Sequence, residues 1–178
     1  MSENVETREG WLSSDDIETM RGRMPIVYVE AVPVRTDALG MITHVGLLLR
    51  PMPDGSISRA IVSGRILFNE RVRDCLVRNL EKDLGPIALP RIPPCPAPFT
   101  VAEYFPDPSV SGFHDPRQHA VSLVFLVPVD GDCQPSQSAL DLAWLTPEEV
   151  LRPDIRAEMA SGHDRLVRAA LAHAGCLA

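Results

Sequence analysis

The chain has 178 residues, the length of one globular domain, and 45% of them are apolar, which is enough for a sizeable core. Its formal net charge of −7 argues against nucleic acid as the main partner, because binding a phosphate backbone needs a basic surface. A free nucleotide is not excluded by this charge, because its phosphates need only a few local cations.

The cysteines give no sign of a metal centre or a disulfide framework. Cys75, Cys95, Cys133 and Cys176 form no Cys-x-x-Cys pair, and none has a histidine at metal-site spacing. We therefore expect free thiols in a reducing compartment. Residues 1–10 are polar and acidic, unlike a signal peptide, and no apolar run approaches the roughly 18 residues of a membrane span. These features predict a cytoplasmic protein without a membrane partner.

Apolar patterning predicts the elements in chain order. Residues 1–10 are expected to form a disordered tail, and residues 11–178 a single domain. Ser13 and Asp16 fit a capping box, so a short helix follows and ends at Pro25. Runs of β-branched and apolar residues then predict strands at Ile26–Val34, Thr43–Leu49, Ile57–Val62, Phe99–Tyr104, Ala120–Val129 and Ala139–Leu145.

The clearest helix is predicted over Glu70–Leu84, where apolar residues recur every four positions and Gly85 ends the run. Ser63-Gly64-Arg65 is interpreted as a break before this helix, with Gly64 in a turn. Thr146 caps a later helix, and a final helix covers His163–Ala174. This order of elements predicts an α/β sandwich rather than a doubly wound parallel sheet.

A proline-rich segment over residues 86–98 contains six prolines. We prefer an extended connection on the surface of one domain to an interdomain linker, because neither side is long enough to be stable alone. Such a path can present Ile87, Leu89, Ile92 and Phe99 to a second copy, which predicts a homodimer. The alternative is that these side chains cover the chain's own sheet.

The main functional motif lies around the predicted helix, in GRILFNERVRDCLVRNLEKDLGP. Five residues separate Gly64 from Glu70, and seven separate Glu70 from Arg78; Asp83 and Gly85 follow. This spacing resembles the Nudix box. Flanking segments over residues 11–50 and 142–149 are similar too, so the resemblance covers about residues 11–175 and is closest to an actinobacterial branch of that superfamily.

The resemblance implies an α/β; Nudix-type α/β/α sandwich with a mixed β-sheet. It also implies hydrolysis of a nucleoside diphosphate linked to another moiety, with Mg²⁺ or Mn²⁺ as the cofactor. Where the box has three metal-binding glutamates, however, this chain has Asn79, Lys82 and Asp83. These positions share one helix face, which carries one negative, one positive and one neutral group.

That face predicts weak metal binding or none. Mg²⁺ prefers an octahedron of hard anionic oxygens, and Lys82 would repel it. At about 5 Å and an effective dielectric near 20, the repulsion costs roughly 3 kcal/mol for each unit of charge on the ion. One weakly held metal ion on Asp83 and the carbonyl of Gly64 is the remaining metal site.

GDP-mannose mannosyl hydrolases resemble this reduced pattern and imply roles for particular residues. Asp83 would be the catalytic metal ligand, and Arg65 would face the leaving nucleoside diphosphate. Gln137 lies near the place of a further glutamine ligand, but Ser138 stands where those enzymes have a histidine base. Arg50, at a strand end, is a candidate phosphate contact, because guanidinium matches phosphate oxygens; a surface cation is the alternative.

Several of these residues also have plainer interpretations. Glu70 and Arg78 are expected to be structural parts of the box, orienting the loop before the helix, as are Gly64 and Gly85. Asp83 is more often a helix-surface carboxylate than a ligand. Lys82 is expected to be solvated, although it could replace the charge of the metal.

The loop with His114, Asp115, Arg117 and His119 is interpreted as an ordinary polar loop, although a metal or base role is an alternative.

Two hypotheses of function remain open from the sequence. The first is a hydrolase that acts with a single weakly held divalent metal on Asp83. The second is a catalytically silent Nudix-fold module that binds a nucleotide-like small molecule or a protein partner. The charge of the helix face at positions 79, 82 and 83 favours the second hypothesis, and the fold resemblance favours the first.

Overall fold

The computed structural model describes residues 11–52, 54–135 and 139–177, and these residues build one seven-stranded sheet with helices on both faces. The strands are β1 (Ile26–Thr36), β2 (Ile42–Pro51), β3 (Ile57–Ala60), β4 (Val62–Arg65), β5 (Thr100–Tyr104), β6 (Ala120–Pro128) and β7 (Asp141–Leu145). The helices are α1 (Ser14–Arg21), α2 (Val72–Leu84), α3 (Pro147–Val150), α4 (Pro153–Ala157) and α5 (His163–His173).

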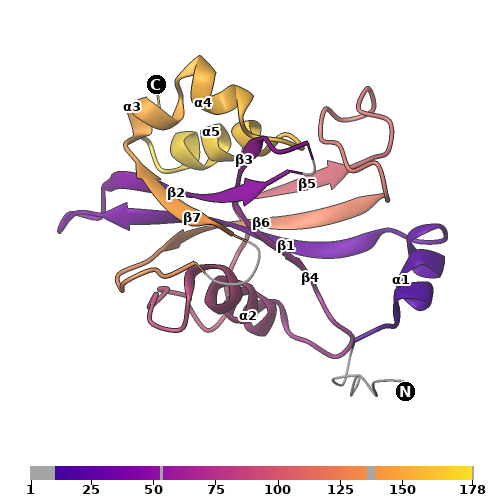
Figure 1. Cartoon of the computed structure of the whole chain (residues 1–178). Coiled ribbons are helices and arrows are strands. Elements are labelled where there is room, and N and C mark those ends of the chain that lie inside the picture. Colours follow the sequence, from indigo (N-terminus) through magenta and orange to yellow (C-terminus); the bar gives the residue numbers. More distant parts are fainter. Residues whose placement is uncertain (1–10, 53, 136–138, 178) are drawn as a thin grey trace.

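The sheet is mixed, as the sequence resemblance predicts. Its main order is β3-β2-β1-β6-β5, while β4 also pairs with β1 and β7 with β2. Strands β1 and β6 run parallel, and the other paired strands run antiparallel. Helix α2 lies on one side of the sheet and helices α3, α4 and α5 on the other, which gives the expected α/β/α sandwich (Figure 1). Helix α1 lies beyond one end of β1.

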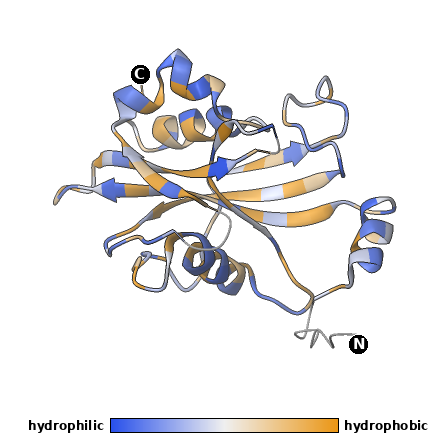
Figure 2. Cartoon of the chain, viewed as in Figure 1, coloured by the Kyte–Doolittle hydropathy of each residue, from blue (hydrophilic) through white to orange (hydrophobic). Residues whose placement is uncertain are grey.

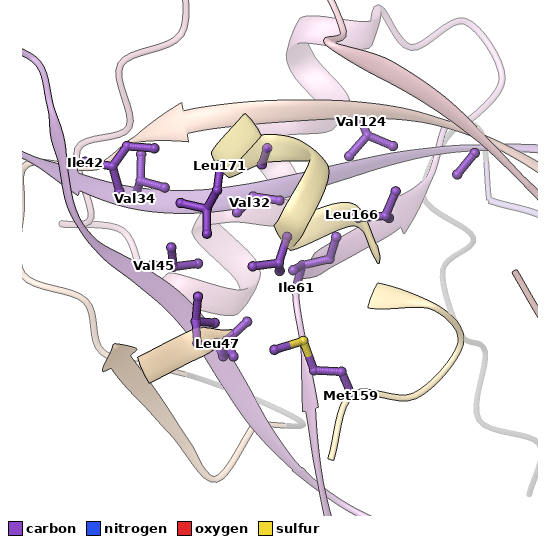
Figure 3. Close-up of a cluster of buried hydrophobic side chains, with 14 of the residues drawn as sticks. Val32, Val34, Ile42, Val45, Leu47, Ile61, Val124, Met159, Leu166 and Leu171 are labelled. Carbon is purple, nitrogen blue, oxygen red and sulfur yellow. The ribbon is translucent and has the colours of Figure 1, made fainter. Parts of the chain in front are cut away.

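The alternation of β1 explains the two cores on either side of the sheet. Val32 and Val34 face α5, whereas Val29 and Ala31 face α2, because successive side chains of a strand point to opposite faces. Hydrophobic residues accordingly concentrate on the strands, and the helices carry both hydrophilic and hydrophobic residues (Figure 2). The core toward α5 includes Val32, Val34, Ile42, Val45, Leu47, Ile61, Val124, Met159, Leu166 and Leu171 (Figure 3).

Helix α2 is fixed by its apolar stripe. Leu76, Leu80 and Leu84 are buried against the sheet, and each contributes about 1.5–3 kcal/mol of apolar burial. The helix begins at Val72, two residues later than predicted, so that Glu70 lies in the preceding loop. Its end is as predicted: Gly85 has a φ of 91°, which glycine adopts without strain.

The predicted strand Ile57–Val62 is wrong in one respect, because the chain changes partner within it. Residues up to Ala60 pair with β2 as β3, and residues from Val62 pair with β1 as β4. The predicted break at Ser63-Gly64-Arg65 is therefore also wrong, since these residues continue β4. An apolar run does not show where a strand exchanges one neighbour for another. Helix α4 was not predicted either.

The proline-rich segment passes the end of β6, as a surface connection would, but it includes a turn at residues 86–87 and a bend at residues 94–95 and is not extended throughout. The amide of Arg91 donates to the carbonyl of Pro128 at 2.8 Å. Ile92 and Phe99 pack against the chain's own two cores, whereas Ile87 and Leu89 remain exposed, by 48% and 63%. Ile92 and Phe99 therefore cover the chain's own sheet, as the alternative interpretation holds. Ile87 and Leu89 are exposed, and the homodimer remains a prediction.

Thr146 caps α3, as the sequence predicts, and its contacts with Glu149 form a capping box. The hydroxyl of Thr146 accepts from the amide of Glu149, whose carboxylate accepts from the amide of Thr146. Within the described part of the chain, no helix is both long and apolar enough to cross a membrane.

Candidate functional site

The loop between β4 and α2 is held by an ion pair. Arg78 donates to both carboxylate oxygens of Glu70, at 2.6 and 2.8 Å, and also to the carbonyl of Arg65 at 2.9 Å. Glu70 accepts in turn from the amide of Leu67 at 2.9 Å. The helix is thereby tied to both ends of the loop that precedes it. This is the geometry that the structural interpretation of Glu70 and Arg78 requires.

The same contacts make a prediction about acid stability. Hydrogen bonds from Arg78 hold the pKa of Glu70 below its ordinary value of 4.5, against the opposing effect of partial burial. A carboxyl whose folded pKa is lowered contributes stability above its unfolded pKa and loses it as the pH falls through the folded value. We expect Glu70→Gln to lower the free energy of unfolding by about 2 kcal/mol at pH 7.

That deficit should shrink as the pH falls from 4.5 through the lower folded pKa, because Glu70 is protonated first in the unfolded chain and then in the folded wild type. Urea denaturation at pH 7 and in acid measures both quantities. Glu81→Gln, at an exposed position of α2, is the matched control and should leave stability unchanged at both pH values. A deficit of Glu70→Gln that is the same at both pH values would contradict the ion-pair explanation.

Gly64 lies in β4 directly against the side chain of Asn79. A Cβ built on Gly64 would stand 1.9 Å from Oδ1 of Asn79, so the position requires glycine for steric reasons. Asn79 is buried, and its Nδ2 donates to the carbonyl of Cys75 at 2.9 Å. This bond directs Oδ1 away from the helix axis. Burial raises the pKa of the Cys75 thiol to about 12, which makes it a poor nucleophile.

Asp83 is fully buried, so its interpretation as a helix-surface carboxylate is wrong. Its Oδ2 accepts from a guanidinium nitrogen of Arg50 at 3.2 Å. Its Oδ1 lies 3.6 Å from Nζ of Lys82 and has no hydrogen-bond partner within the described structure. Arg50 reaches this position from β2, so the strand end that the sequence predicts for it does lie next to the box helix.

Lys82 is also not simply solvated, since 31% of its side chain is exposed and its ammonium lies among oxygens. Nζ donates to Oδ1 of Asn79 at 3.1 Å and to the carbonyl of Ser63 at 3.5 Å. The structure thus brings Arg50, Asp83 and Lys82 together next to β4. Two cations and one carboxylate meet there.

A divalent metal ion does not fit this arrangement. Among residues 11–52, 54–135 and 139–177, no group of three or more His, Cys, Asp or Glu side chains could hold a metal ion. Asp83 is the carboxylate of this cluster, and two cations already compensate it. The carbonyl of Gly64, the other expected ligand, lies 3.9 Å from the thiol of Cys75.

Arg65 does not join the cluster. The guanidinium of Arg65 lies over the ring of Trp11, 5.4 Å from its centroid. Arg78 contacts the same ring at 5.6 Å. Gln137 falls outside the described residues. Gly85, as the C-cap of α2, has a structural place: a Cβ there would approach the carbonyl oxygen of Gln134 to 2.8 Å.

A cavity of about 250 Å³ opens on the α5 side of the sheet. Glu30 of β1 is buried at its base and accepts from the hydroxyl of Tyr104 at 2.9 and 3.0 Å. Nε2 of His163, the first residue of α5, lies 3.2 Å from Glu30, while Nδ1 of His163 has no partner among the described residues. Burial raises the pKa of Tyr104 strongly, so its hydroxyl remains a donor. Ser63 also lines this cavity.

The rim of the cavity comes from the polar loop that the sequence analysis left without a function. Gln118 donates to the hydroxyl of Tyr28 at 2.9 Å and to the carboxylate of Asp115 at 2.8 Å. Burial acts to raise the pKa of Asp115, but hydrogen bonds from Arg117 outweigh it and lower that pKa. His119 instead stacks on Phe105 at 4.5 Å.

Sequence reasoning missed Glu30, Tyr104 and His163. One signal for Glu30 was present: a carboxylate in the middle of an apolar, β-branched strand, on the inward face shared with Val32. Burial of a charge in such a strand requires hydrogen-bonding partners, and these indicate a site. The identity of the partners depends on the fold.

The sandwich, the box spacing and the ion pair that joins Arg78 of α2 to Glu70 of the preceding loop define a protein with the Nudix hydrolase-like fold. Within that class, the chain belongs to the family described as Domain of unknown function (DUF4916), which matches residues 7–176. No curated protein matches the chain.

Solved structures show the same relationship. A protein of Jonesia denitrificans, described as a possible asymmetric diadenosine tetraphosphate hydrolase, is 60% identical with a TM-score of 0.84, covering 86% of this chain and 96% of that one. The Nudix domain of Shewanella oneidensis NrtR, crystallised with ADP ribose, is 17% identical with a TM-score of 0.60, covering 89% and 97%.

A bifunctional NMN adenylyltransferase/ADP ribose pyrophosphatase of Francisella tularensis, complexed with AMP and a manganese ion, is 16% identical with a TM-score of 0.60. The match covers 90% of this chain and 47% of that one. At this identity, the likeness to the Shewanella and Francisella proteins concerns the fold.

Proposed function

We propose that this protein binds a nucleoside diphosphate linked to another moiety, with an organic group in the Glu30–His163 cavity and the phosphates at Arg50 and Lys82. One observation carries the proposal: Ser63 of β4 belongs to both places. It lines the cavity, and its carbonyl accepts from Lys82 at 3.5 Å. A ligand that passes over β4 therefore connects the cavity with the two cations.

The chemistry of both ends suits such a ligand. Arg50, Lys82 and Asp83 together carry one net positive charge, and the side chains of Arg50 and Lys82 remain partly exposed, by 27% and 31%. Guanidinium and ammonium groups are the usual partners of phosphate oxygens. At the other end, Glu30, Tyr104 and His163 line the cavity and give it a polar wall for the organic group.

The size of the cavity limits how much of the ligand it can hold. Its volume of about 250 Å³ lies just below the roughly 300–1,000 Å³ of common ligand pockets. It therefore takes one end of the ligand, and the rest extends along β4. Binding is the proposed role, since the compensated carboxylate of Asp83 supplies no net negative charge for the two-metal chemistry of an active box.

The test is calorimetric titration with ADP ribose and with diadenosine tetraphosphate. We expect wild type to bind at least one of them, and Arg50→Met to weaken binding at least tenfold, about 1.4 kcal/mol. Arg168→Met removes an exposed arginine of α5 and serves as the matched control, with affinity unchanged. Wild type that binds neither ligand at millimolar concentration, or equal losses in both variants, would overturn the proposal.

Hydrolysis is the second candidate function, favoured by the 60% identical protein described as a possible diadenosine tetraphosphate hydrolase. Incubating wild type and Asp83→Asn with diadenosine tetraphosphate, in the presence of Mg²⁺ or Mn²⁺, separates the two candidates. Nucleotide products that form with wild type and disappear with the variant would establish the hydrolase. Binding without products would leave the binding function.

A further inference from the structure

We infer that the ammonium of Lys82 is the built-in cation of the box, held in an oxygen cage in place of a divalent metal ion, and that the protein engages anions there without metal. The inference starts from the contacts of Nζ. It lies 3.1 Å from Oδ1 of Asn79, 3.5 Å from the carbonyl of Ser63 and 3.6 Å from Oδ1 of Asp83. Oxygens from both α2 and β4 thus lie around one ammonium.

The oxygens around the ammonium are held in place by contacts that do not involve Lys82. Asn79 is locked by its hydrogen bond to the carbonyl of Cys75 and by contact with the backbone of Gly64. The carbonyl of Ser63 is part of β4, whose pairing with β1 sets its position. A group that coordinates a cation has to be held in one orientation, and the buried amide of Asn79 is held in this way. A solvated lysine would not need such a partner.

Asp83 completes the cage and shows that the lysine is needed. Its carboxylate is fully buried, and a buried charge is tolerated only when it is paired. Arg50 satisfies Oδ2, whereas Oδ1 has Lys82 as its nearby cation and no hydrogen bond among the described residues. The ammonium therefore supplies the second half of the charge compensation.

This arrangement excludes a divalent metal ion, which the glutamates of a complete box would attract. A divalent ion that entered the cage would meet the charges of Lys82 and Arg50 together, and these already compensate the carboxylate of Asp83. An anion is attracted to the cluster, because Arg50, Lys82 and Asp83 together carry one net positive charge. The inference that phosphates bind here rests on the proposed function. The inference that a metal ion is excluded does not rest on it.

The first experiment measures Mn²⁺ binding by electron paramagnetic resonance. Wild type is expected to bind with a Kd above about 1 mM, whereas Asn79→Glu with Lys82→Glu should bind at least tenfold tighter, because several carboxylates then share the face. Arg168→Glu makes the same charge reversal on the exposed face of α5 and should not change affinity. A wild-type Kd at or below about 10 μM would overturn the inference.

Folding of the variants is verified by thermal melting, and Lys82→Glu alone provides a second variant if the double one unfolds. A folded Lys82→Glu protein that binds Mn²⁺ no better than wild type also overturns the inference. In that case Lys82 would not be what keeps the ion out.

The second experiment titrates ADP in EDTA and in Mg²⁺. Wild type should bind with the same affinity, within about twofold, in both; Lys82→Met should lose at least tenfold in EDTA, and Lys82→Arg should retain most of the affinity. ADP binding that requires Mg²⁺ overturns the inference. If ADP binds in neither condition, the proposed function fails, and the Mn²⁺ measurements still decide the role of Lys82.

Discussion

Gly64→Ala is expected to lower the free energy of unfolding by about 3 kcal/mol, the upper range for overpacking a buried contact. The added Cβ would stand 1.9 Å from Oδ1 and 2.3 Å from Cγ of Asn79. Asn79 cannot withdraw without losing its bond to Cys75 and its contact with Lys82. Urea denaturation gives the loss directly, and the melting temperature should fall with it.

The matched control is Gly22→Ala at the end of α1. A Cβ there meets its nearest neighbour at an ordinary 3.7 Å, so stability should be unchanged or slightly higher. Combining Gly64→Ala with Asn79→Ala removes the collision, and the double variant should lose less than the sum of the two single changes. Strictly additive losses would show that the contact with Asn79 is not the cause.

Glu30→Ala is expected to cost about 3 kcal/mol as well, because it leaves two buried groups without their acceptor. The hydroxyl of Tyr104 and Nε2 of His163 both bond to this carboxylate. Glu30→Gln keeps an acceptor of the same shape and should cost clearly less. Chemical denaturation of the three proteins measures the difference.

Glu103→Ala, at an exposed position of the neighbouring strand β5, provides the control for a lost carboxylate and should be nearly neutral. If Glu30→Ala unfolds at the same denaturant concentration as Glu103→Ala, the buried network does not stabilise the fold. The cavity wall would then owe its shape to packing alone.

The features that could be predicted from the sequence are local. The stripe of Leu76, Leu80 and Leu84, the glycine after it and the threonine cap of α3 each depend on residues that are close together in the sequence, and the structure has all of them. The box spacing was enough to indicate the Nudix-type fold, because it reflects contacts between a helix and the loop directly before it.

The features that could not be predicted depend on residues far apart. In the helix pattern Asp83 is one more polar position, and the partner that compensates its buried carboxylate, Arg50, lies 33 residues earlier in the chain. Glu30 and His163 are 133 residues apart, so their contact exists only once the sheet and α5 are assembled. The exchange of partner between β3 and β4 has the same origin, because pairing is a property of two strands and not of one.

The parallel pair β1–β6 sets the order in which this protein can be completed as it is made. Ile26 pairs with Ala120 and Val34 with Pro128, so the central strand has one neighbour encoded most of the way along the chain. At about 5–20 residues per second on the ribosome, β1 waits roughly 5–20 s for that neighbour. Until then an apolar strand carries a row of unpaired amides and carbonyls, which is a template for pairing with other chains. The interval between the synthesis of β1 and that of β6 is therefore the one in which this strand is most open to pairing with other chains.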